Sequence, residues 1–277
     1  MNIYKFKTNR NASKVGLFCN ARDEKNIKEW AAHHLLIGFD SIIIFDHKSI
    51  QPLTEVFSNF DKRLTIIPVN LEADNIKQKL MNSASQIAKK MNLDWFIYLD
   101  ADEFLILNDF FKGVKHFLNA YSYADSIGVN WVMFGSNDLI EEPEGLILEN
   151  YNRSCEKLDQ HVKSFVRPEQ IKYSDNPHYY RMKNTNRMLG IDFRVMKYPQ
   201  CFNRLNIHFQ NCNAYIAHYV YQSEETYKKR KLNLLGDNGI QRSNMGKEIH
   251  NLYNDKINLQ PQKYVRNIKE FLQHYSK

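Results

Sequence analysis

Short apolar runs alternate with segments of helical periodicity over the first part of the chain. The runs predict four strands, at Val15–Cys19, Ser41–Phe45, Leu64–Val69 and Trp95–Leu99. The third run contains Pro68, which is typical of an edge strand or of a strand end. Apolar residues at helical spacing predict helices over 27–38 and 76–91. The alternation predicts an α/β fold with a Rossmann-like, mostly parallel sheet flanked by helices.

The pattern is less regular in the second part of the chain. Ile127–Met133 predicts a further strand, whereas residues 135–215 are rich in Asn, Tyr, Pro and charge, as in loops and short strands over a sheet. From Ser223 the pattern is helical again, with acidic residues before basic ones, which suits the helix dipole. We therefore expect a main domain over 1–222 and a basic, helical C-terminal region over 223–277.

Polar clusters follow three of the predicted strands directly. These clusters are Asn20–Glu24, Asp46–Ser49 and Asp100–Asp102. Ligands of parallel α/β sheets bind outside the carboxyl ends of the strands. The sequence therefore predicts a functional site at this edge of the sheet.

Asp100 and Asp102 form the most specific of these clusters. Two carboxylates at positions i and i+2 after a strand can point to the same side and share one divalent cation. Magnesium or manganese held in this way keeps positions open for phosphate oxygens and neutralises charge on a departing diphosphate. Solvated acids at a strand end are the alternative interpretation. An EF-hand is excluded, because its Gly and its terminal Glu are absent.

Composition narrows the class of protein. The chain has 277 residues, of which 43% are hydrophobic and 25% charged, as in soluble globular proteins. No apolar run is long enough to span a membrane, and the N-terminus does not resemble a signal peptide. The four cysteines show no zinc-binding spacing. These features predict a cytoplasmic protein.

Positive charge is concentrated towards the C-terminus. The formal net charge is +7, and residues 218–277 hold 11 Lys and Arg against 6 Asp and Glu. Such an excess attracts nucleotide phosphates, nucleic acid or an acidic membrane surface. A solvated helical surface is the alternative.

Motifs that follow one another over roughly residues 15–232 resemble the glycosyltransferase family 2-like and family 92 group. They are Glu24, Glu29-Trp30, His34 and Gly38-Phe39-Asp40; Ile43-Ile-Phe-Asp46; Asp94-Trp-Phe-Ile-Tyr-Leu-Asp-Ala-Asp-Glu-Phe104; Trp131-Val-Met-Phe-Gly-Ser136; His161-Val-Lys-Ser-Phe-Val-Arg-Pro168; Asn176-Pro-His178; and His218-Tyr-Val-Tyr-Gln-Ser223. The resemblance implies a GT-A fold, a nucleotide-sugar donor (usually a UDP-sugar) and a divalent metal. It divides the main domain into a nucleotide-sugar half, about 1–110, and an acceptor-side half, about 111–222.

The resemblance also implies which residues bind the nucleoside. Ala21, Arg22, Glu24 and Asp46 match positions that follow the first two strands, where such enzymes hold the donor. Asp46 is expected to accept a hydrogen bond from the base or the ribose. Capping of a turn or helix is the alternative role for Asp46.

The resemblance implies that five further residues bind the diphosphate or the metal. Asp100 and Asp102 match the metal-binding DxD motif, and Asp102 is the expected direct ligand and catalytic residue. His218 matches a late histidine that completes the metal site, and the implied cofactor is Mn²⁺ or Mg²⁺. Lys163 and Arg167 resemble a basic pair that meets the diphosphate beside Asp100.

An inverting transfer also needs a general base near the acceptor hydroxyl. Asp138 is the candidate, because it follows directly after the motif at Phe134–Asn137. Glu141, Glu142 and His178 are further candidates.

Together, these observations predict a metal-dependent glycosyltransferase that acts on a glycan or lipid-linked glycan in surface polysaccharide or lipopolysaccharide synthesis. One alternative is a DxD-type phosphatase, although such enzymes carry the motif on their first strand. Another is a basic nucleic-acid-binding protein, but the signal at Tyr227–Lys231 is short, so no nucleic-acid partner is expected. Peripheral contact with an anionic membrane, on its inner face, is a further expectation, through the basic residues of 224–277, which include the run Lys228–Lys231.

Overall fold

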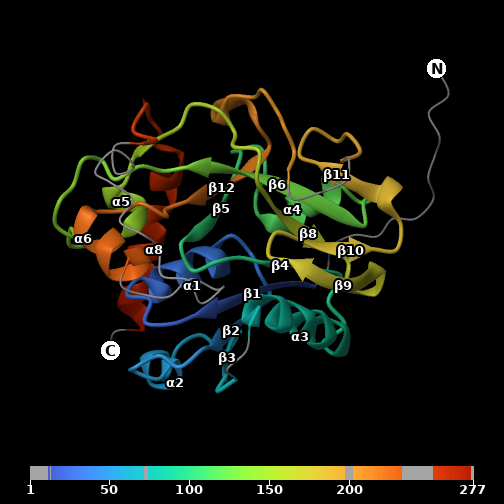
Figure 1. Ribbon diagram of the computed structural model, residues 1–277, viewed down its shortest axis with the longest axis horizontal. Helices are drawn as coiled ribbons and strands as arrows, with labels where there is room; N and C mark the ends of the chain where they lie inside the picture. The colour runs from blue at the N-terminus through green and yellow to red at the C-terminus, as the bar shows by residue number, and fades with distance from the viewer. Residues whose placement is uncertain (1–11, 13, 72–73, 197–201, 233–251, 276–277) are drawn as a thin grey trace.

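A mixed sheet forms the centre of the protein in the computed structural model, which describes residues 12, 14–71, 74–196, 202–232 and 252–275 (Figure 1). Within these residues the sheet has nine strands: β1 (Val15–Ala21), β2 (Ser41–Asp46), β3 (Leu64–Pro68), β4 (Trp95–Tyr98), β5 (Glu103–Leu107), β6 (Ser126–Met133), β8 (Val162–Val166), β11 (Met188–Gly190) and β12 (Ala214–His218). Their order is β3-β2-β1-β4-β8-β6-β12-β5, with β11 also paired to β6.

Strand direction changes in the middle of this sheet. The first four strands in spatial order, β3 to β4, are parallel neighbours. Strand β8 is antiparallel to both β4 and β6, whereas β12 is parallel to β6 and antiparallel to β5. The predicted α/β fold with a mostly parallel, helix-flanked sheet is confirmed, and β8 and β5 are its antiparallel members.

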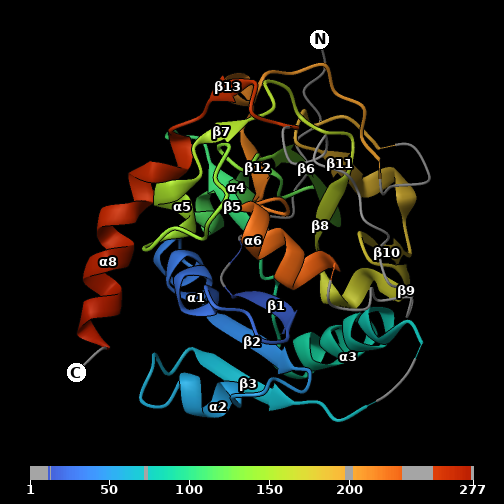
Figure 2. The ribbon, with the colours of Figure 1, turned by 60° about the vertical axis from the view of Figure 1, so that its left-hand side comes forward.

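Helices and smaller sheets surround the main sheet (Figure 2). The α-helices of the described residues are α1 (Ile27–Leu36), α2 (Leu53–Val56), α3 (Ile76–Lys90), α4 (Val114–Ala120), α5 (Ile147–Asn150), α6 (Glu224–Tyr227) and α8 (Val265–His274). A hairpin is formed by β9 (Ile171–Asn176) and β10 (Tyr179–Met182), and β7 (Arg153–Ser154) pairs with β13 (Lys256–Ile257). Short 3₁₀ turns lie at Pro168–Gln170, Thr185–Arg187, Phe209–Asn211 and Gln260–Tyr264, and a π-helical turn, Lys228–Leu232, follows α6.

Two hydrophobic cores lie on opposite faces of the parallel strands. Successive side chains of a strand point to opposite faces, so a strand that is apolar throughout contributes to both cores. In β1, Leu17 belongs to the core that contains Trp30 of α1, whereas the next residue, Phe18, belongs to the core that contains Leu80 of α3. Continuous apolar runs in the sequence therefore correspond to strands covered by a helix on each side.

The elements predicted for the first part of the chain are present with small shifts in their bounds. The predicted strands correspond to β1, β2, β3 and β4, and the predicted helices correspond to α1 and α3. Strand β3, which ends at Pro68, lies at one edge of the sheet, as its proline indicated.

The C-terminal residues pack against the first half of the chain. The ring of Tyr264 lies 4.7 Å from that of His33 on α1, and Lys263 donates a hydrogen bond to the carbonyl of Leu107. Near the end of the chain, Tyr275 donates to Asp61 at 3.3 Å. Part of the predicted helical region 223–277 therefore lies along the main domain, and residues 233–251 and 276–277 lie outside the described residues. Among the helices that the structure describes, none has the length and apolar character needed to cross a membrane.

Candidate active site

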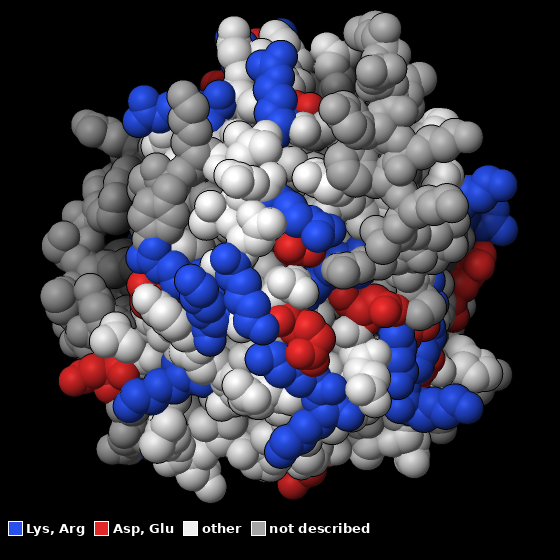
Figure 3. Space-filling model, turned by 90° about the vertical axis from the view of Figure 1, so that its right-hand side faces the viewer, with Lys and Arg blue, Asp and Glu red and all other residues white. Residues whose placement is uncertain are grey.

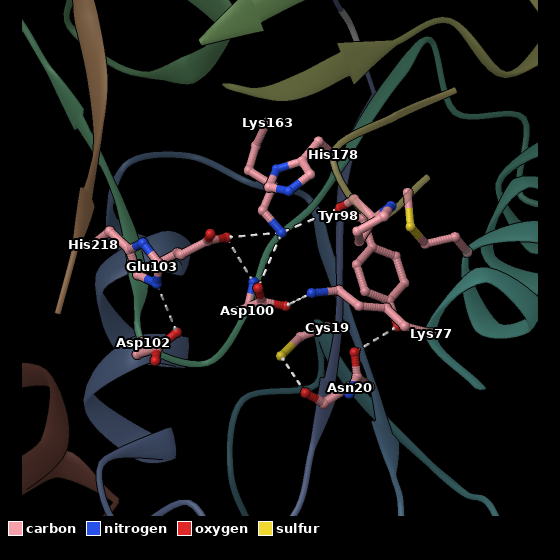
Figure 4. A network of polar contacts seen from close by, with 12 residues as sticks. Cys19, Asn20, Lys77, Tyr98, Asp100, Asp102, Glu103, Lys163, His178 and His218 are labelled. Atoms are coloured by element: carbon pink, nitrogen blue, oxygen red, sulfur yellow. Dashed lines mark hydrogen bonds and ion pairs between the residues drawn. The ribbon is translucent and has the colours of Figure 1, made fainter. Parts of the chain in front are cut away.

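Asp100 lies between two buried lysines at the carboxyl end of β4 (Figure 4). Lys77, in the first turn of α3, places Nζ 2.5 Å from Oδ1, and Lys163 on β8 places Nζ 3.1 Å from Oδ2. The lysine side chains are 8% and 1% exposed, whereas that of Asp100 is 29% exposed. The partly exposed carboxylate of Asp100 thus forms ion pairs with the ammonium groups of two buried lysines.

The charge balance of this cluster depends on the neighbouring Glu103. Burial alone would raise the pKa of Asp100, but the charges of Lys163 and Lys77 outweigh it and hold that pKa well below its usual range. Burial raises the pKa of Glu103 to about 7, although Lys163 lies 3.4 Å from Oε2. The same Oε2 accepts a hydrogen bond from the backbone N–H of Asp100, which fixes the turn between β4 and β5. Within the described residues, Glu103 Oε1 is buried and has no hydrogen-bond partner.

Asp102 points away from this lysine cluster, towards His218 at the end of β12. His218 Nε2 lies 3.7 Å from Asp102 Oδ1. The ring of Trp131 on β6 packs against the imidazole of His218 at a centroid distance of 4.3 Å and orients it. The motif predicts that its two carboxylates share one cation, whereas the structure directs Asp100 to two lysines and Asp102 to His218 and Arg230.

Arg230 completes the surroundings of Asp102. Its Nη2 atom lies 3.3 Å from Asp102 Oδ2 and 2.8 Å from Glu24 Oε2. Burial of the guanidinium would lower its pKa, but the carboxylates of Glu24 and Asp102 raise it well above the usual value. Arg230 therefore joins the loop after β1 to the turn after β4.

The donor atoms near Asp102 suit a divalent cation in their chemistry. Carboxylate and imidazole groups are ligands for manganese, and Asp102, His218 and Glu24 supply both kinds. In the described part of the chain, however, no three His, Cys, Asp or Glu side chains are already arranged around a common metal position. The residues fit a metal ion, provided that Arg230 leaves the position between Glu24 and Asp102.

The remaining residues predicted to bind the nucleoside lie at the ends of β1 and β2. Ala21 is the buried last residue of β1, and Arg22 is exposed beside Asp23. Asp46 accepts backbone hydrogen bonds from Ser49 and Leu53 at 3.2 and 2.8 Å. These contacts correspond to the capping role that was the alternative for Asp46.

The pairing of Lys163 with Arg167 at the diphosphate is wrong. Strand β8 runs antiparallel to β4, so Lys163 lies at the end of β4 that carries Asp100, whereas Arg167 lies beside Trp95 at its start. The two positions are separated by about 13 Å of extended chain, at about 3.3 Å per residue. The Arg167 guanidinium stacks on the Trp95 ring at 4.3 Å and donates to the carbonyl of Ala124 at 3.0 Å. Arg167 therefore stabilises the opposite end of the sheet.

Asp138 lies on the loop after β6, with a left-handed backbone conformation (φ 59°). Its side chain is 60% exposed, lies 3.4 Å from Arg153 and accepts a hydrogen bond from Asn254. Glu141 and Glu142 follow on the same loop and line a surface pocket of about 420 Å³ together with Glu224 and Glu225.

The fourth candidate base, His178, lies beside the lysine cluster (Figure 4). Its ring packs against that of Trp131 at 5.2 Å, and Nδ1 lies 3.2 Å from the carbonyl oxygen of Val162. Burial, assisted by the charges of Lys163 and Lys77, lowers the pKa of His178 to about 3. The imidazole is therefore neutral at neutral pH.

Sequence patterns did not identify Lys77, Glu103, Trp131 or Arg230 as members of the site. One signal for Arg230 was available. On a helix, Lys228 and Lys229 are four residues after Glu224 and Glu225, and both pairs form ion pairs, at 2.6 and 2.8 Å. Arg230, by contrast, has Thr226 four residues before it, so the sequence offers it no such partner on the helix.

Comparison with known proteins gives the family. The family described as Glycosyltransferase family 92 matches residues 16–260, which extends past the span of about 15–232 given by the sequence motifs. Two solved structures are similar at a low level. HddC from Yersinia pseudotuberculosis is 10% identical, with a TM-score of 0.38 over 64% of this chain and 89% of its own. A CMP:2-keto-3-deoxy-manno-octonic acid synthetase complexed with CTP is 10% identical, with a TM-score of 0.30 over 59% of this chain and 80% of its own. No curated protein matches the chain.

Proposed function

Because the chain belongs to glycosyltransferase family 92, we propose that it transfers a sugar from a UDP-sugar to a glycan or lipid-linked glycan acceptor in surface polysaccharide synthesis. Membership of this family shows that the protein is a glycosyltransferase, and it argues against the alternative of a DxD-type phosphatase. The identity of the donor, the metal and the acceptor is what we propose here.

The lysine cluster carries this proposal. Lys77 and Lys163 converge on Asp100 at the carboxyl end of β4, which is the edge of a parallel sheet where ligands bind. Ammonium groups held by a carboxylate are oriented before the donor arrives, so little reorganisation is needed to meet the charge of a diphosphate. Because Glu103 has a pKa of about 7, the two lysines keep a positive excess over Asp100 until Glu103 ionises.

For the metal, we propose that Asp102 and His218 hold Mn²⁺ or Mg²⁺. A bound divalent ion would supply charge stabilisation for the leaving diphosphate. Asp102 is nearly buried, at 3% exposed, so its charge is screened little by solvent and favours a cation strongly. Asp100 then acts as the anchor of the two lysines.

On the acceptor side, we propose Asp138 as the general base. Its carboxylate is exposed, so an acceptor hydroxyl can reach it without rearrangement of the core. Its loop begins next to His218, because the backbone N–H of Phe134 donates to the His218 carbonyl at 3.0 Å. Removal of the hydroxyl proton by Asp138 would activate the acceptor oxygen for attack on the sugar.

A panel of UDP-, GDP-, ADP- and CMP-sugars, each incubated with the protein and manganese, tests this function. We expect slow release of UDP from one UDP-sugar in the absence of acceptor. Lys163→Met should abolish that release, whereas Lys172→Met, which changes an exposed lysine on β9, should not. Release of another nucleotide in preference to UDP would contradict the proposed donor, and no release from any sugar nucleotide would contradict the activity.

Contact with an anionic membrane stays a prediction. Lys228 and Lys229 are exposed but paired with glutamates, and Arg230 faces the interior, so much of this basic run is already balanced. Figure 3 views the side of the molecule away from α6, and on that face Lys and Arg side chains are interspersed with acidic ones. Sedimentation with anionic vesicles at low and high salt would measure any binding, which should weaken as salt rises.

A further inference from the structure

One positively charged nitrogen of Arg230 is shared by two carboxylates. Nη2 lies 2.9 and 2.8 Å from the two oxygens of Glu24, and 3.3 Å from Oδ2 of Asp102. Glu24 precedes Arg230 by 206 residues and Asp102 precedes it by 128. The fold thus brings two acidic residues from separate loops to a single cationic atom.

This arrangement has the geometry and the charge that a metal site requires. Two carboxylates contact Nη2, and the imidazole of His218 lies 3.7 Å from the other oxygen of Asp102; carboxylates with an imidazole suit manganese. Metal–oxygen distances are shorter, about 2.1 Å for magnesium, so the carboxylates would have to move inwards by less than about 1.5 Å. Without Arg230, the two carboxylates would lose the cation that they share, and their combined charge of −2 would match a divalent ion.

We propose that Arg230 occupies the cation position between Glu24 and Asp102, and that a divalent metal ion binds only when the guanidinium moves out. The inference rests on the proposed metal site. It adds Glu24 as a ligand and makes Arg230 a competitor of the metal.

The local structure around Arg230 allows such a movement. Helix α6 has only four residues, is capped by Ser223, and continues as a π-helical turn. The side chain of Arg230 is 18% exposed, so solvent reaches part of it although its guanidinium faces the two carboxylates. Rotation about its side-chain bonds would bring the guanidinium into solvent without breaking the sheet.

Competition of this kind lowers the apparent affinity for the metal. When only a fraction of the protein has the position open, the apparent dissociation constant rises by the inverse of that fraction. Loss of the guanidinium should therefore tighten metal binding, even though it removes ion pairs from the metal-free protein. A purely structural role for Arg230 predicts the opposite, because a loosened site binds metal less well.

Direct Mn²⁺ titration followed by electron paramagnetic resonance of the free ion tests the proposal without any activity assay. Arg230→Gln should bind Mn²⁺ about tenfold or more tightly than the unmodified protein. Arg230→Lys, which keeps a charge on a different head group, should show an intermediate affinity. Lys229→Gln removes one positive charge from the neighbouring exposed residue and should change the affinity less than twofold. This control shows whether the effect of Arg230→Gln comes from the place of the guanidinium or only from the lower net charge of the protein.

The outcomes separate this inference from the metal proposal. If Arg230→Gln and the unmodified protein bind Mn²⁺ equally, or if the variant binds it less tightly, competition is wrong and the metal site stands. If neither binds Mn²⁺, both ideas fail. Should Arg230→Gln not fold, as judged by circular dichroism, Arg230→Lys decides alone, and an affinity equal to or below that of the unmodified protein overturns the inference.

Discussion

The ammonium of Lys77 lies 2.5 Å from a carboxylate oxygen of Asp100, a residue of a different element 23 positions later in the chain. Lys77 stands in the first turn of α3, and α3 packs over the face of the sheet that contains Phe96 of β4. Because the helix lies against the sheet, its first turn reaches the carboxyl ends of the strands. The first carboxylate of a motif predicted to bind a metal therefore has a lysine as its partner.

Lys77→Met should weaken UDP binding about tenfold, since one of two ammonium groups near the diphosphate is lost. Stability should fall by about 1–2 kcal/mol, because Asp100 keeps Lys163 as a partner. Titration calorimetry with UDP measures the first effect and urea unfolding the second. Lys79→Met, on the exposed face of the same helix, is the matched control, and equal effects in the two variants would remove Lys77 from the site.

Asp102→Asn keeps the size of the side chain and removes its charge. We expect Mn²⁺ affinity and transfer to fall by about 100-fold or more, and a chelator should inhibit the unmodified enzyme reversibly. The unfolding midpoint should fall modestly, because the variant loses an ion pair to Arg230, which keeps Glu24 as a partner. Asp109→Asn, at an 88% exposed carboxylate, controls for the loss of one negative charge. Full activity of the Asp102 variant, or of the chelated enzyme, would refute a metal at this position.

Asp138→Asn should lower kcat for transfer about 100-fold, within the usual range for loss of a general base. UDP affinity should not change, because the carboxylate of Asp138 contacts Arg153 and Asn254, whereas the two lysines that are proposed to meet the diphosphate contact Asp100. Asp175→Asn, at another exposed carboxylate paired with an arginine, serves as the control. An unaltered kcat would exclude Asp138 and direct attention to Glu142 and His178.

Acid should destabilise the protein through His33. This residue is buried on α1, its Nε2 lies 2.9 Å from the carbonyl oxygen of Leu105, and burial lowers its pKa from 6.5 to about 4. Between these two values the unfolded chain binds the proton more readily than the folded protein does. The free energy of unfolding therefore falls as pH drops from about 6.5 to 4, and His33 accounts for about 2 kcal/mol of that loss by pH 5.

His33→Gln tests this assignment, because its amide can donate to Leu105 but does not titrate. Urea unfolding at pH 7.5 and pH 5 should show a difference about 2 kcal/mol smaller in the variant. The exposed His274 gives the control variant His274→Gln, whose pH dependence should match that of the unmodified protein. An unchanged difference in His33→Gln would mean that other groups cause the acid sensitivity.

The edge at which the site lies was predictable from the sequence for a simple reason. Parallel strands end at the same edge of a sheet, so polar residues after β1, β2 and β4 were bound to be neighbours once those strands were identified. Asp46 and Asp100 lie there as expected. What Asp46 does there was not predictable, since its hydrogen bonds to Ser49 and Leu53 depend on the path of the loop.

The sequence by itself determined which segments form strands and helices, because apolar periodicity and strand-ending residues such as Pro68 influence only the residues near them in the chain. Only the tertiary structure decided which charges meet. The antiparallel direction of β8 brought Lys163 to Asp100 and carried Arg167 to the other end of the sheet. Packing of the turn after α6 brought Arg230 to Asp102 across 128 residues. Such contacts depend on strand order, strand direction and helix packing, which no short-range pattern of residues specifies.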